Sequence, residues 1–147
     1  MSLRRAVESH IKFCLDPYFT NSKYQVVESL RLKDRPLPSI VIVAGAGKPA
    51  LPELPASYDN WSVPVTGVVN SSIDDTTVDQ HNEVSYTLGQ VLATKACRFH
   101  STVQGLYVYD IIRGSQGQEN EGRKMIAVHN YEAMVNYSPT PSLDPPA

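Results

Sequence analysis

Residues 61–96 read WSVPVTGVVNSSIDDTTVDQHNEVSYTLGQVLATKA, and two periodicities meet within them. In residues 61–73 apolar and small residues alternate with polar ones, which is the period of two of a half-buried strand. In residues 84–92 apolar residues recur three and four positions apart, as on one face of a helix. Between them, Thr77 and Gln80 have the spacing of a capping box. The segment therefore predicts a long strand, a corner and a helix.

The composition places bounds on the class of protein. At 147 residues, with 41% apolar and 19% charged residues, the chain has the size and composition of one globular domain. No apolar run approaches the roughly 20 residues that a membrane span requires, so we expect no membrane partner. The net charge of −2 excludes the strong overall field of a nucleic-acid-binding protein. Cys14 and Cys97 lie in apolar helical contexts, which favours two buried thiols over a disulfide.

Further elements are predicted on both sides of the central segment. Apolar residues at helical spacing predict a helix from Leu3 to Leu15, ended by Asp16-Pro17 because proline disfavours α geometry in the preceding residue. Residues 18–38 hold apolar residues without a sustained period, which predicts a loop or a short irregular strand. The other predicted segments are a β-branched strand at 40–43, a proline-rich exposed loop at 48–60, a strand at 106–113, a polar hairpin loop at 114–122 and a returning strand at 123–137.

The order helix, strand, strand, helix, strand, strand predicts an α+β fold, with a mixed, mainly antiparallel sheet of about four strands and two helices packed on one face. Residues 1–137 are expected to form a single domain, and residues 138–147 an extended proline-rich tail. On the returning strand, Ile126, Val128 and Met134 share one face. That face is more apolar than a solvated strand face requires, which indicates a covering helix or a neighbouring subunit.

Acidic and imidazole side chains gather at the start of the second helix, at Asp74, Asp75, Asp79, His81 and Glu83. A calcium loop beginning at Asp75 would lack both the glycine and the final glutamate that such a loop needs. His81 falls on the apolar helix face, which favours a packed, hydrogen-bonded histidine over a ligand. With no GxSxG and no complete phosphate-binding loop, we predict no catalytic, cofactor or metal site. A small metal-assisted hydrolase using His81, Asp75, Asp79 and Glu83 is the alternative from another class.

The ordering of elements, with a few loop residues, resembles a known family. The quoted features are an N-terminal amphipathic helix, RPLPSIVIV at 35–43, SSIDDTTVDQHNEV at 71–84, YVYDIIRGS at 107–115, EGR at 121–123 and a final long strand. Together they are similar to the tail terminator, or tail completion, proteins of long-tailed bacteriophages. The resemblance covers residues 1 to about 138.

This resemblance implies a structural virion protein without catalysis, made in the host cytoplasm. A small α/β protomer would form a hexameric ring that caps the tail tube and joins it to the neck. The implied partners are copies of the chain itself, the tail tube protein, a neck or connector protein, and DNA passing through the lumen without sequence recognition. Another neck component, such as a head-completion or connector protein, is the nearest alternative.

Two predicted loops are the expected contact regions of such a ring subunit. Both are polar, and loops of this length often serve contacts. The predicted interface residues are Arg113, Gly114, Gln116, Gln118, Glu119 and Arg123 in and beside the loop at 114–122, and Lys48, Pro52 and Asp59 in the loop at 48–60.

Overall fold

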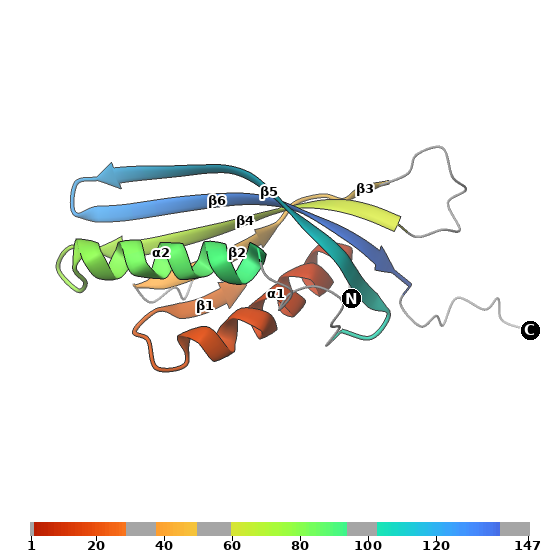
Figure 1. Ribbon diagram of the computed structural model, residues 1–147, viewed down its shortest axis with the longest axis horizontal. Helices are drawn as coiled ribbons and strands as arrows, with labels where there is room; N and C mark the ends of the chain where they lie inside the picture. The colour runs from red at the N-terminus through yellow and green to blue at the C-terminus, as the bar shows by residue number, and fades with distance from the viewer. Residues whose placement is uncertain (1, 29–37, 50–59, 94–102, 139–147) are drawn as a thin grey trace, which may run out of the picture.

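The computed structural model of the chain describes residues 2–28, 38–49, 60–93 and 103–138. Two helices cover one face of a mixed, mostly antiparallel sheet (Figure 1). In chain order the elements are α1 (Leu3–Phe19), β1 (Gln25–Glu28), β2 (Ser39–Ala44), β3 (Lys48–Pro49), β4 (Asn60–Ser72), α2 (Val78–Ala93), β5 (Leu106–Glu121) and β6 (Lys124–Tyr137). The predicted α+β class is confirmed, but the sheet has six strands because the short β1 and β3 join the predicted four.

The strands are arranged in the order β1-β2-β4-β6-β5, with β3 pairing the start of β4 beyond the end of β2. β1 and β2 run parallel, and every other pair is antiparallel. The predicted loop at 48–60 was wrong at both ends, since Lys48 and Pro49 pair with Ser62 and Trp61, and Asn60 begins β4. Propensity alone missed these residues because cross-strand pairing, not side-chain type, makes them strand.

Helix α1 begins after Ser2, whose Oγ accepts a hydrogen bond from the Arg5 amide at 3.3 Å. The prediction that Asp16-Pro17 ends this helix was wrong, because α1 continues to Phe19. In the last turn a proline removes only one backbone hydrogen bond. Thr20 Oγ1 donates to the Asp16 carbonyl at 2.9 Å, and Phe19 is buried in the core. These contacts hold the final turn in place.

The buried face of α1 also holds the exposed edge of β2. Arg4 Nε donates to the Ala44 carbonyl at 2.7 Å, and the Ala44 amide donates to Glu8 Oε2 at 3.0 Å. Among the residues that the structure describes, β1 ends opposite Ile42 and no strand pairs with Ala44 on that side. The two charged side chains therefore replace the missing strand partner. Within the described residues, neither helix is long and apolar enough to cross a membrane.

The predicted corner between β4 and α2 is confirmed. Thr77 and Gln80 form a reciprocal capping box, with the Gln80 amide donating to Thr77 Oγ1 and the Thr77 amide donating to Gln80 Oε1, both at 3.1 Å. The predicted helix face is also confirmed, because Leu88, Val91 and Leu92 are buried. The strand predicted at residues 61–73 was wrong only at Ile73, which lies in the turn and is 54% exposed.

The predicted polar loop at 114–122 was wrong, because β5 continues through this segment to Glu121. Gln116 to Glu121 pair residue by residue with β6, and the turn contains only Gly122 and Arg123. Gly122 has a φ of 59°, a conformation that favours glycine. The side chains of this stretch are exposed, so no apolar period marked it as a strand; backbone pairing alone defines it.

Candidate assembly surface

The β5–β6 hairpin carries most of the residues predicted to form an interface. Figure 1 shows the turn of this hairpin at one end of the long axis of the molecule, beside the start of α2. Gln116, Gln118, Glu119 and Arg123 lie toward its turn, whereas Arg113 and Gly114 lie near the middle of β5, where Arg113 pairs with Tyr131; all six residues are exposed. The structure therefore places these six predicted residues along one hairpin, on paired strands in place of the expected flexible loop.

The other predicted interface residues are not part of this surface. Lys48 is exposed on β3, which lies at the opposite end of the long axis from the hairpin turn (Figure 1). Pro52 and Asp59 lie outside the described residues, as do Cys97 and the tail after Ser138. The two predicted contact regions are thus separate surfaces. Cys14 is buried in α1, as predicted.

The hairpin turn is tied to the β4–α2 corner. The Ile73 amide donates to the Arg123 carbonyl at 2.8 Å, and Arg123 Nη1 forms an ion pair with Asp74 Oδ1 at 2.6 Å. The backbone bond continues the sheet around the turn, and the ion pair lies on the surface. Both contacts fix the position of the hairpin end relative to the body of the protein.

Two predicted interface residues also act on the interior. Burial raises the pKa of Tyr131, while the charge of Arg113 and hydrogen bonds from the Arg113 and Gln116 side chains oppose that rise. Burial lowers the pKa of His129, and the Arg113 guanidinium lowers it further. Tyr131 and His129 lie on the face of β6 that packs beneath α2. Arg113 and Gln116 therefore help to anchor β5 as well as form its surface.

The face of the sheet opposite the helices is a second candidate surface, which we call the open face. It carries apolar side chains from three neighbouring strands: Val43, Val68, Ile126, Val128 and Met134 are half-buried, whereas Val41 is already buried within the chain, at 1% exposure. Val41, Val68 and Val128 are register partners and form a continuous row across β2, β4 and β6. The predicted placement of Ile126, Val128 and Met134 on a shared face is confirmed, and all three are half-buried.

Polar pairs accompany the apolar row on the open face. Thr66 Oγ1 donates to Asn130 Oδ1 at 3.0 Å, and Asn136 Nδ2 donates to Asn60 Oδ1 at 3.2 Å. Ser62 Oγ donates to Glu132 Oε1 between the same two strands. Such cross-strand pairs fix side-chain positions on a sheet. The polar side chains of the open face are therefore already held in place by hydrogen bonds within the protomer.

The free edge of β1 provides a third surface, which the sequence did not predict. The Gln25 amide donates to the Pro38 carbonyl, so the backbone groups of Val26 and Glu28 point away from β2. A groove of about 870 Å³ lies between this edge and α1, lined by Phe13 and Val27 among others. The sequence pattern did not predict β1 as a regular strand because β1 is only four residues long.

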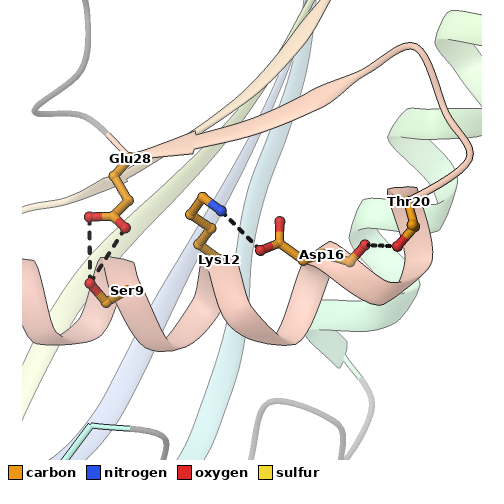
Figure 2. A network of polar contacts seen from close by, with 5 residues as sticks. All are labelled: Ser9, Lys12, Asp16, Thr20 and Glu28. Atoms are coloured by element: carbon orange, nitrogen blue, oxygen red, sulfur yellow. Dashed lines mark hydrogen bonds and ion pairs between the residues drawn. The ribbon is translucent and has the colours of Figure 1, made fainter.

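Charged and polar side chains in this groove bind one another (Figure 2). Lys12 Nζ pairs with Asp16 Oδ2 at 2.9 Å along α1, and Ser9 Oγ lies 3.5 Å from both carboxylate oxygens of Glu28. The second contact crosses from α1 to β1. A strand edge beside a helix is the geometry in which proteins accept an additional strand.

The acidic and imidazole side chains at the start of α2 do not converge on one point. His81 is fully buried and bonds to Ser71, whereas Asp74, Asp75, Asp79 and Glu83 are exposed. The residues described by the structure contain no group of three or more His, Cys, Asp or Glu side chains that could hold a metal ion. The prediction of a packed, hydrogen-bonded histidine is confirmed.

Comparison with protein-family models and with curated proteins finds no match to this chain.

Proposed function

We propose that this chain is a structural virion protein, a tail terminator whose copies form a hexameric ring at the end of a bacteriophage tail tube. The observation that carries the proposal is the open face, where apolar side chains form a row across three strands on the side of the sheet away from both helices. Apolar sheet faces are normally covered, by helices or by other subunits. Neighbouring copies are the proposed cover.

The two outer edges of the sheet, at β1 and β5, support assembly into a ring in particular. The sheet begins at β1 and finishes at β5, and neither outer edge pairs with another strand in the described parts of the chain. The two edges differ, since β1 is short and lies beside a groove while β5 is long and carries two register irregularities. Contacts between unlike surfaces generate rings when the rotation closes. The exposed hairpin end then faces the adjoining ring, the tail tube protein or the neck protein.

The test is the assembly state of the purified protein. Electron microscopy and native mass spectrometry at high concentration are expected to show closed rings. Val128→Asp, which places a charge in the apolar row, is expected to abolish the rings and to leave the circular dichroism spectrum of the protomer unchanged. Gln90→Asp is the matched control, because Gln90 is exposed on α2, away from the open face.

The outcomes separate the hypotheses. Hexameric rings lost in the Val128 variant support the terminator. Dodecameric rings favour a head-completion or connector protein of the same neck. Compact monomers, even in assembled particles, contradict both. The hydrolase using His81, Asp75, Asp79 and Glu83 requires a metal to copurify with the wild-type protein.

A further inference from the structure

We propose that two serine–histidine pairs fasten α2 to the sheet only while both histidines are neutral, so that mild acid releases this helix from the fold. The first pair is Ser71 Oγ on β4 with His81 Nδ1 on α2, at 2.7 Å. The second is Ser85 Oγ on α2 with His129 Nε2 on β6, at 2.6 Å. We call the four residues the histidine clamp. Helix α2 contributes one histidine and one serine, β4 contributes a serine and β6 contributes a histidine.

The second ring nitrogen of each histidine is the reason that charge is excluded. His81 Nε2 and His129 Nδ1 are buried and have no hydrogen-bond partner among the described residues. A neutral imidazole has one N–H and one acceptor, whereas an imidazolium has two N–H donors and a full charge. Protonation therefore always leaves a charged, buried donor unmatched, which costs far more than an unmatched neutral group.

The groups around the two rings do not offset that charge. His81 faces Ser71, which also bonds to the Tyr24 hydroxyl at 2.5 Å, so a neutral phenol completes this chain. His129 faces Ser85 from α2 and the Arg113 guanidinium from β5, and Tyr131 lies beside it on β6. The positive charge of Arg113 opposes a second cation. Burial lowers the pKa of both histidines from the ordinary value of 6.5.

The helix lies close to the sheet at the clamp. A Cβ on Gly89 would stand 3.7 Å from the His129 ring and 3.6 Å from Tyr131 Oη. The Tyr131 hydroxyl is 3.5 Å from the Gly89 carbonyl. A charged ring cannot be hydrated in this space while α2 stays docked. Undocking of α2 gives both rings access to water. Helix α1 holds a separate buried histidine, His10, whose Nε2 lies 3.6 Å from Cys14 Sγ.

The sign of the pH effect follows from the depressed pKa values. Above pH 6.5 the histidines are neutral in both the docked and the released states, and the clamp is fully formed. Below pH 6.5 the released state binds protons that the docked state excludes, so docking weakens as the pH falls. Each histidine raises the opening constant by up to about tenfold per pH unit, and the two together by up to about a hundredfold.

Native-state hydrogen exchange of the full chain, corrected for the intrinsic exchange rate, tests the proposal between pH 7.5 and 5. The comparison is made in the His10→Gln variant, which removes the buried histidine of α1. In this variant the amides of α2 are expected to lose protection as the pH falls while those of α1 keep it. His81→Gln and His129→Gln are each expected to reduce the pH dependence to about tenfold per unit. Ser85→Ala is the control, since it weakens docking at every pH and leaves the slope intact.

Several results would overturn the clamp. These are α2 protection that does not change with pH, simultaneous loss of protection in α1 and α2 of the His10→Gln variant, or an unchanged slope in both the His81→Gln and the His129→Gln variants. If the glutamine variants do not fold, the wild-type profile and the Ser85→Ala profile still decide the matter. The clamp is a property of the folded protomer, so its outcome is independent of ring assembly.

Discussion

Along β6, alternate side chains serve two different faces of one sheet. Met125, Ala127, Tyr131, Ala133, Val135 and Tyr137 are buried beneath the helices, together with His129. The residues between them, on the open face, are half-buried and include Asn130, Glu132 and Asn136. The covered face fills a core, whereas the open face combines an apolar row with fixed polar pairs. We propose that the covered face provides stability and that the open face provides the contact between copies.

Truncation of one apolar side chain on each face gives the largest contrast. Leu88 is fully buried and packs over Gly67, so Leu88→Ala is expected to reduce the free energy of unfolding by about 2–5 kcal/mol. Val128→Ala removes half-buried atoms from the open face, and about 1 kcal/mol or less is expected. Urea unfolding, carried out at a protein concentration too low for ring assembly, measures both losses. Equal losses would show that the open face is part of the protomer core.

The next contrast lies within the hairpin, between two glycines of β5. A Cβ at Gly114 would stand 2.9 Å from the Asn130 carbonyl oxygen, whereas a Cβ at Gly117 would meet nothing within 4 Å. Gly114→Ala forces the backbones of β5 and β6 apart at the register irregularity, and a loss of about 1–3 kcal/mol is expected. Gly117→Ala is expected to change the free energy of unfolding by less than about 0.5 kcal/mol. Similar losses in both variants would mean that the hairpin is sensitive to any side chain.

The helix-covered half of the fold was largely predictable from sequence. Its buried side chains lie on one face of each element, so apolar residues recur in the sequence with the period of a helix or a strand. Alternation in β4 and β6 and the helical spacing around Leu88 were confirmed by burial. The capping box was confirmed because it depends only on two residues at a fixed spacing. In these segments the local pattern and the tertiary structure agree.

The exposed half was less predictable for the same physical reason. Residues 114–121 form a strand whose side chains are solvated, so neither periodicity nor propensity distinguishes it from a polar loop. The short segments β1 and β3 are likewise strands because they pair with residues distant in the sequence. Of the candidate surface, the hairpin residues and the apolar face were predicted, while the β1 edge and its groove required the sheet order.

The capping box of Thr77 and Gln80 lies at the β4–α2 corner, where the helix-covered half of the fold meets the exposed half. Thr77→Ala leaves the Gln80 amide without its 3.1 Å partner, and a loss of about 1 kcal/mol in the free energy of unfolding is expected. Thr77→Ser is the matched control because it retains the hydroxyl. Thermal unfolding followed by circular dichroism measures both. If the serine variant is destabilised as much as the alanine variant, the contribution comes from the threonine methyl group and not from the cap.

The smallest effect is expected where the hairpin end meets the corner, at the ion pair between Arg123 and Asp74. The two side chains are 78% and 55% exposed, so solvent screens their attraction, and the coupling energy is expected to be about 0–1 kcal/mol. The backbone bond from Ile73 to the Arg123 carbonyl persists when either side chain is removed, so the hairpin should keep its position. A double-mutant cycle with Arg123→Ala and Asp74→Ala, measured at low and high salt, determines the coupling. A large coupling that survives high salt would show that this end of the hairpin is held by electrostatics and not by the sheet.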